Sequence, residues 1–272
     1  MRDDLSHGLH RLRAQRIHHG TRSEHEDAVV VETPVALLYN GLPFAVMMAT
    51  PSDLDDFALG FALGEGIVAR ADEFRLVDTV RSDAGIALHG AIPQARFDAL
   101  EHRRRNLEGR SGCGLCGVES LRDALRPVPR VAVPADVSTA AIRTALAALS
   151  HQQPLNALSG GVHAAGFVHP DGLLVREDVG RHNALDKLVG ALAVHPMPID
   201  RRHGFLVITS RASYEIVHKA ATAGIGAVIA ISAPTDLAIR IADEAGITLA
   251  AFARGDTLNV YTHPARIVAS RD

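Results

Sequence analysis

The sequence predicts an α/β protein with two domains, the second built on a mostly parallel sheet that is flanked by helices. The 272 residues suffice for two domains with a hydrophobic core each. In the second half of the chain, apolar segments of strand length alternate with segments of helical periodicity, and repeated β-α-β order requires parallel neighbouring strands. The prolines Pro127, Pro129 and Pro134 indicate a linker between the halves.

The composition is that of an ordinary soluble globular protein, with 47% hydrophobic and 22% charged residues. A net charge of −3 argues against a general nucleic-acid binder, and the absence of tryptophan argues against stacking platforms for single strands. The longest apolar run, residues 225–233, is about half as long as a membrane span, and no signal-peptide core is present at the N-terminus. We therefore expect a cytoplasmic protein with no membrane and no nucleic-acid partner.

The first half is expected to contain a tail and a smaller α+β domain. Residues 1–26 combine five arginines with five histidines and few apolar residues, which predicts a mobile basic and His-rich tail. In the domain at residues 27–130, Asn40-Gly41 predicts a type I′ hairpin turn. The predicted elements are strands at 29–32, 35–39, 44–49, 74–80 and 85–88, and a buried helix that follows residues 50–53 and ends at Gly64 and Gly66.

The second domain, residues 131–272, has the clearer pattern. A helix is predicted first, then a hairpin and a second helix, and after these the chain repeats strand and helix in turn. The predicted helices are at 139–149, 183–193, 214–223 and 237–245, and the predicted strands are at 161–168, 173–176, 205–209, 227–231, 248–252 and 257–261.

The two cysteines of the chain stand three apart in the stretch Gly112-Cys113-Gly114-Leu115-Cys116-Gly117. The residues after it have helical periodicity, so Cys116 is expected near a helix N-terminus, where the thiol pKa falls. Nearby arginines add positive charge, and together these features favour a nucleophilic cysteine. Half of a structural zinc site and a thioredoxin-like redox pair are the alternatives. A complete zinc site would need two further ligands from the histidines.

Polar segments follow three predicted strands of the second domain. They are Thr209 to Ser213, Ser232, and Phe252 to Asp256. Ligands of open α/β sheets bind outside the carboxyl ends of the strands, so these segments are expected to share one site. Arg211 with the neighbouring serines suits an anion, and Asp256 suits the N–H pair of a guanine. Plain helix capping by serine and threonine is the alternative.

A second polar cluster, Arg176 to Asn183, precedes a predicted helix, with His163 upstream on a strand. The density of this run is unusual for a solvated surface. A single histidine that alternates with apolar neighbours is, however, more often structural than catalytic.

The order of elements in the second domain resembles the cytidine deaminase-like fold. Deaminases of that fold carry a zinc site built from His-x-Glu and Pro-Cys-x-x-Cys. The corresponding places here read Gly180-Arg181-His182-Asn183 and Ser210-Arg211-Ala212-Ser213. We therefore expect neither deamination nor a tightly bound metal.

The combined motifs resemble the FdhD family, the formate dehydrogenase accessory sulfurtransferases, from about Val31 to the C-terminus. The matching stretches are Gly112 to Gly117, Gly160 to Ala165, Arg176 to Lys187, Ser210 to Ser213 with Glu215, and Tyr261 to Pro264. The resemblance implies a persulfide relay. Sulfur would come from a cysteine desulfurase and pass to the molybdenum bis(molybdopterin guanine dinucleotide) cofactor, the bound substrate, for use by formate dehydrogenase.

The resemblance also assigns residues. It implies that Cys113 carries the persulfide, with a less defined part for Cys116, and that the guanine dinucleotide contacts Phe252, Ala253, Arg254, Gly255, Asp256 and Thr257. Our own additions to this site are Ser210, Arg211 and Ser213. A homodimer stays open. So do two other functions, a cofactor-binding chaperone without sulfur transfer and a zinc-stabilised interaction module.

Overall fold

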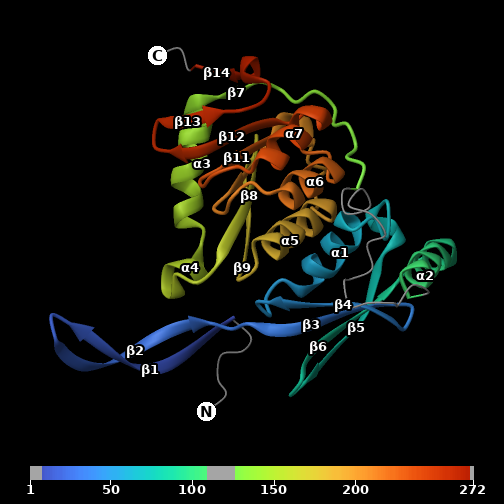
Figure 1. Ribbon diagram of the computed structural model, residues 1–272, viewed down its shortest axis with the longest axis horizontal. Coiled ribbons are helices and arrows are strands. Elements are labelled where there is room, and N and C mark those ends of the chain that lie inside the picture. Colours follow the sequence, from blue (N-terminus) through green and yellow to red (C-terminus); the bar gives the residue numbers. More distant parts are fainter. Residues whose placement is uncertain (1–7, 109–125, 270–272) are drawn as a thin grey trace.

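The computed structural model describes residues 8–108 and 126–269 (Figure 1). A four-stranded sheet of order β4-β3-β6-β5 forms the base of the first half. Asn40 and Gly41 join β3 to β4 with φ values of 48° and 85°, as the predicted type I′ turn requires. The strands are β3 (Thr33–Tyr39), β4 (Leu42–Ala49), β5 (Arg75–Ser82) and β6 (Gly85–Ala91).

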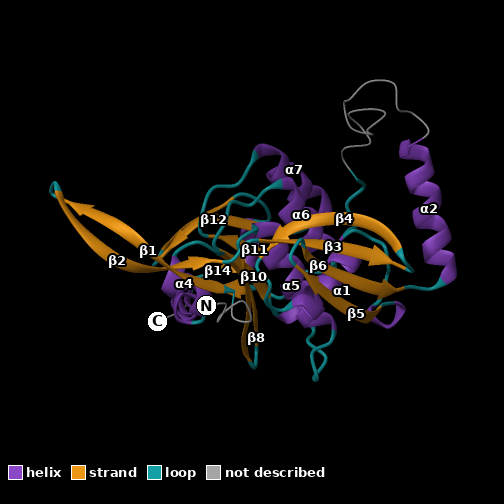
Figure 2. Cartoon of the chain, turned by 90° about the horizontal axis from the view of Figure 1, so that it is seen from below, coloured by secondary structure: helices purple, strands orange, loops and turns teal. Residues whose placement is uncertain are grey.

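Helix α1 (Leu54–Gly64) covers one face of this sheet because its apolar side chains recur at helical spacing. Phe57 and Phe61 pack there against Leu37, Tyr39 and Leu88. The short helix η2 (Ala71–Glu73) follows α1, and helix α2 (Gln94–Glu108) follows β6. In Figure 2, α2 stands at the end of the molecule opposite to the N-terminal hairpin.

Two parts of the structure differ from the predictions for this half. Residues expected to be a tail form an antiparallel hairpin of β1 (Leu9–His18) and β2 (Thr21–Val30), which projects from the body (Figures 1 and 2). Its side chains are almost all exposed, so no buried alternation marks it in the sequence. Helix α2 is polar and lacks an apolar stripe, so periodicity does not reveal it either.

The second half contains a six-stranded sheet of order β13-β12-β11-β10-β8-β9. The prediction of a mostly parallel sheet is wrong: β10, β11 and β12 are parallel to one another, whereas β8, β9 and β13 run antiparallel to their neighbours. Short turns join β8 to β9 and β12 to β13, and short turns connect only antiparallel strands. The bounds are β8 (His163–His169), β9 (Gly172–Asp178), β10 (Phe205–Ile208), β11 (Ala227–Ala230), β12 (Thr248–Arg254) and β13 (Thr257–Val260).

Helices cover both faces of this sheet, as predicted. On one face α5, α6 and α7 form a continuous apolar core with alternate residues of the strands, and on the other face α3 does so. These helices are α3 (Thr139–His151), α5 (Arg181–Ala193), α6 (Tyr214–Thr222) and α7 (Asp236–Ala245). The smaller elements are α4 (Pro154–Ser159), η3 (Arg201–His203), η4 (Pro264–Arg266), β7 (Val137–Ser138) and β14 (Ile267–Val268).

The two halves meet where α1 crosses α5 (Figure 1). Gly60 and Gly190 stand at this crossing. A Cβ atom added to Gly60 would lie 1.7 Å from the Asp186 carbonyl oxygen, and one added to Gly190 would lie 1.9 Å from the Asp56 carbonyl oxygen. Only glycine permits so close an approach of two helix backbones. The halves are therefore held in direct backbone contact.

Candidate functional site

The segments that follow β10 and β11 lie side by side with the end of β12 and its turn, at one edge of the six-stranded sheet. We call this edge the crest and define it by residues 209–213, 231–235 and 252–257. Ala212 and Pro234 form a parallel bridge, and the Phe252 N–H donates to the Ser232 carbonyl oxygen at 3.2 Å. The predicted binding residues Ser210, Arg211, Ser213 and Phe252 to Thr257 thus share one edge.

The first crest segment offers a cation beside a helix start. Arg211 is exposed, whereas Ser210 is buried and its hydroxyl donates to the Arg211 carbonyl oxygen at 3.1 Å. Ser213 precedes the first residue of α6, and its side chain makes no capping hydrogen bond there. The N–H groups in the first turn of α6 and the Arg211 guanidinium are consequently suited to an anion, while the Ser210 hydroxyl supports its own turn.

The third crest segment includes an irregular turn between β12 and β13. Phe252 has a φ of 55° at a bulge, and its side chain is 43% exposed, which leaves a ring face open to a ligand. Gly255 also has a positive φ. The carboxylate of Asp256 lies 2.8 Å from Arg143 of α3, and both side chains are exposed. Exposed ion pairs contribute little stability, so a ligand could replace this partner.

Three side chains from neighbouring elements extend the crest. His163 begins β8, and the N–H of the next residue donates to Thr209 Oγ1 at 2.9 Å. At the start of α5, His182 Nε2 lies 2.8 Å from Glu215 Oε2 and 3.4 Å from Ser213 Oγ. Sequence reasoning did not place these residues in the site. Of the three, only His182 belongs to the dense polar run at residues 176–183, and the two ends of that run serve different purposes.

Burial and neighbouring charges set the electrostatics of the crest. Burial, with the Arg181 and His182 charges in support, lowers the pKa of His163, so this ring is neutral at pH 7. The hydrogen bond from His182 lowers the pKa of Glu215, which is therefore ionised. Arg181 Nε is buried and has no hydrogen-bond partner among the described residues. A buried donor without a partner costs free energy, and an anionic ligand could satisfy it.

The other end of the polar run joins the two halves. The Arg176 guanidinium pairs with Asp56 of α1 at 2.7 Å. Asp178 and Lys187 form a completely buried ion pair at 2.7 Å, and Lys187 Nζ also donates to the Thr50 carbonyl oxygen at 3.0 Å. These side chains are fully engaged with the first half, so their part in the motif is structural.

Cys113 and Cys116 lie outside the described residues. The described chain resumes at Arg126, whose N–H donates to the Tyr214 hydroxyl at 2.8 Å and whose guanidinium lies 2.5 Å from the Glu65 carboxylate. Tyr214 is the first residue of α6 and directly follows Ser213. Arg126 therefore lies beside the first turn of α6 and the end of α1. Arg126 lies ten positions after Cys116, and ten residues of fully extended chain span at most about 35 Å.

Among the side chains that the structure describes, no group of three or more from His, Cys, Asp or Glu is arranged to hold a metal ion. The two segments that the sequence analysis compared with deaminase zinc motifs lie together, since His182 is beside Ser213. No helix in the described part of the chain is long and apolar enough to cross a membrane.

Comparisons with known proteins agree with one another. A sequence model of the FdhD/NarQ family matches residues 30–268. The "Sulfur carrier protein FdhD" of Xanthomonas euvesicatoria pv. vesicatoria (strain 85-10) is 53% identical over 259 residues, which cover 94% of this chain and 92% of the relative. The protein of that name from Variovorax paradoxus (strain S110) is 49% identical over 246 residues, which cover 90% and 88%.

A solved structure is similar over nearly its whole length. It is described as the crystal structure of a formate dehydrogenase accessory protein from Desulfotalea psychrophila, with a TM-score of 0.73 and 26% sequence identity. The match covers 96% of this chain and 99% of the other. Both halves of the fold, and not the second alone, are thus shared with that protein.

Proposed function

The chain belongs to the FdhD/NarQ family, as its motifs predict, and we propose that it is a sulfur carrier required for formate dehydrogenase activity. The relatives named as sulfur carriers cover both halves of the chain, and the structural neighbour is described as a formate dehydrogenase accessory protein. Formate dehydrogenase is accordingly the proposed partner, and the cytoplasm the proposed location.

In its finer form the proposal is a relay through Cys113. The Cys113 thiolate attacks the outer sulfur of a persulfide on a cysteine desulfurase, the donor's S–S bond breaks, and the donor cysteine leaves as a thiolate. The step needs no oxidant, because the sulfur moves at an unchanged oxidation level. A thiolate is the reactive form, and the arginines around the motif favour it.

The acceptor is the molybdenum bis(molybdopterin guanine dinucleotide) cofactor, bound as substrate at the crest. The observation that carries this part is the convergence of three strand ends on one edge. Arg211 and the α6 N-terminus suit the diphosphate, and Arg181 adds a buried donor that has no partner in the described part of the chain. Phe252 to Thr257 suit the guanine, with the Phe252 ring exposed for stacking and Asp256 able to exchange its exposed partner.

A mass measurement tests the relay. The pure protein is incubated with a cysteine desulfurase and cysteine, and its intact mass is recorded before and after reductant. A gain of about one sulfur that reductant removes is expected for a persulfide. An unchanged mass would favour the alternative of a cofactor-binding chaperone that moves no sulfur. The other alternative, a zinc-stabilised module, predicts one zinc per chain by elemental analysis, lost in Cys113→Ala.

Nucleotide binding tests the crest separately. We predict that calorimetric titration shows tighter binding of GDP than of ADP, because the diphosphate contacts are shared while Asp256 or a nearby backbone group suits guanine. Arg211→Gln should weaken binding of GDP by about tenfold or more. Arg202→Gln is the matched control, since Arg202 is exposed and pairs with Asp200 away from the crest. Equal affinity for the two nucleotides would remove guanine from the proposal.

A further inference from the structure

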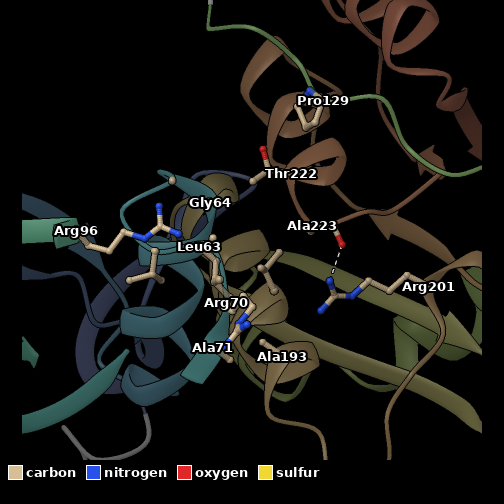
Figure 3. Close-up of a pocket in the computed structure, with 14 residues that line it drawn as sticks. Leu63, Gly64, Arg70, Ala71, Arg96, Pro129, Ala193, Arg201, Thr222 and Ala223 are labelled. Carbon is tan, nitrogen blue, oxygen red and sulfur yellow. Dashed lines mark hydrogen bonds between the residues drawn. The ribbon is translucent and has the colours of Figure 1, made fainter. Parts of the chain in front are cut away.

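A second pocket, of about 480 Å³, lies in the seam between the two halves. The end of α1 with the residues after it and Arg96 of α2 form its first wall, and the ends of α5 and α6 with Arg201 form the second (Figure 3). Pro129, shortly after the cysteine segment, also lines it. The pocket lies at the C-terminal end of α5, whereas the crest lies at its N-terminal end.

Three arginines line this pocket, and they differ in their partners. Arg70 pairs with Asp72, and Arg96 pairs with Glu73 at 3.1 Å. Arg201 donates one hydrogen bond, to the Ala223 carbonyl oxygen at 2.7 Å, and forms no ion pair with any described carboxylate. In Figure 3 its guanidinium reaches toward the middle of the pocket.

Arg201 is consequently a partly buried cation whose charge is not compensated. Burial is the cause that lowers the pKa of Arg201, and no carboxylate among the described residues opposes the effect. An arginine nevertheless stays protonated in proteins. Taking a charge out of water without a counterion costs free energy, so an anion bound in the pocket would be stabilised by Arg201.

We propose that this seam pocket binds a small oxyanion, of the phosphate or polycarboxylate type, on the Arg201 guanidinium. The planar fork of arginine matches both oxyanions bidentately. Arg70 and Arg96 stand on the opposite wall, each paired with a carboxylate, so Arg201 carries the uncompensated charge. Leu63, Val68 and Val189 give the pocket an apolar lining. A bound anion would touch both halves and stabilise their contact. This site is separate from the crest and from the sulfur relay.

Calorimetric titration of the full chain with inorganic pyrophosphate and, in a second arm, with citrate tests the proposal and distinguishes the two oxyanion sources. Arg201→Gln should weaken binding of the preferred probe by about tenfold or more. The matched control is Arg202→Gln, because Arg202 is the next residue and is exposed and paired with Asp200. Arg211→Gln removes the crest arginine and should leave the seam site intact.

A second variant keeps the test valid if Arg201→Gln folds poorly. Ala193→Glu places a carboxylate on the pocket wall, where it can pair with Arg201 and take the place of the anion. It should abolish anion binding without lowering the melting temperature. Three outcomes would overturn the proposal. Both probes could bind Arg201→Gln and Ala193→Glu as they bind the parent, their binding could be lost only in Arg211→Gln, or neither could bind the unmodified protein.

Discussion

Asp178 and Lys187 show how single residues in a functional motif can serve the fold. Both side chains are completely buried, and Asp178 also accepts hydrogen bonds from the N–H groups of Thr50 and Gly180. Removal of one partner would leave an uncompensated buried charge, which typically costs about 3–5 kcal/mol. His182, four residues after Asp178, faces the crest instead. Within one run of sequence, neighbouring residues thus divide structure and site between them.

The two cysteines are a residue-scale question of another kind. A helix dipole favours Cys116 as the more acidic thiol, whereas the family resemblance favours Cys113 as the persulfide carrier. A cysteine that relays sulfur must reach two partners and must be a good nucleophile, and the nucleophilicity of a thiolate falls as the thiol pKa falls. We therefore assign the persulfide to Cys113 and a resolving or orienting part to Cys116.

Cys113→Ala should abolish activation of formate dehydrogenase in cells that lack the native protein, because no thiolate remains to carry the sulfur. Cys116→Ala should leave measurable activity. GDP titration supplies the folding control: the proposed nucleotide contacts come from the crest, so both variants should bind GDP as the parent does. Peptide mapping that finds the trapped persulfide on Cys116 alone would contradict the assignment.

At the scale of elements, the crossing of α1 and α5 determines how the halves fit. Two glycines bring the helix backbones into contact, and the Arg176–Asp56 pair links the same elements nearby. The crest depends on α5, because His182 and Arg181 begin that helix. The crossing therefore positions part of the site as well as part of the core.

Gly60→Ala should destabilise the protein by about 3 kcal/mol, because the added methyl group would overlap the α5 backbone and force the helices apart. Urea denaturation followed by circular dichroism measures the loss. Asp55→Ala is the control on the exposed face of the same helix and should change stability by less than about 0.5 kcal/mol. Equal stability of the two variants would show that the helices are not in such contact.

For the whole molecule, one buried network connects three parts. Lys219 of α6 lies 2.7 Å from Asp186 of α5 and 3.2 Å from Glu65 at the end of α1. Arg126, the first described residue after the cysteine segment, joins through Glu65. This network of charges therefore connects both halves with Arg126. A change of ionisation within the network affects the stability of the whole chain.

Burial raises the pKa of Asp186 from 3.8 to about 6, although Lys219 acts in the opposite direction. Between these pH values the folded chain holds a proton that the unfolded chain has released. The stability that this group contributes is present at low pH and is lost as pH rises through about 6. The side chain of Asp186→Asn cannot titrate. The variant's deficit in free energy of unfolding relative to the parent should therefore shrink as pH rises from 4 to 7. Urea denaturation at a series of pH values measures this deficit.

The control for this pH series is Asp55→Asn, which removes an exposed carboxylate at the start of α1. A deficit of Asp186→Asn that grows with pH would mean that the ionised carboxylate is stabilised by Lys219 more than burial disfavours it.

The sequence by itself determined the order of strands and helices in the second half, the turn at Asn40-Gly41 and the family. Periodicity, turn chemistry and motifs are local properties, so a linear pattern contains them. The proximity of the three crest segments also followed from the sequence, because the carboxyl ends of parallel strands share an edge. The predicted hairpin after the first helix is the β8–β9 pair, but the mixed character of the whole sheet did not follow. The exposed β1–β2 hairpin did not follow either, since exposed pairing leaves no buried alternation.

Only the tertiary structure decided which polar residues belong to the site. Asp178 contacts Thr50, 128 positions earlier in the chain, and Lys219 contacts Glu65, 154 positions earlier. Whether a charged side chain faces a ligand, a partner charge or solvent depends on such distant contacts. The seam pocket has the same origin, because its walls come from both halves. Burial and charge compensation arise when distant segments pack together, and a local pattern does not contain them.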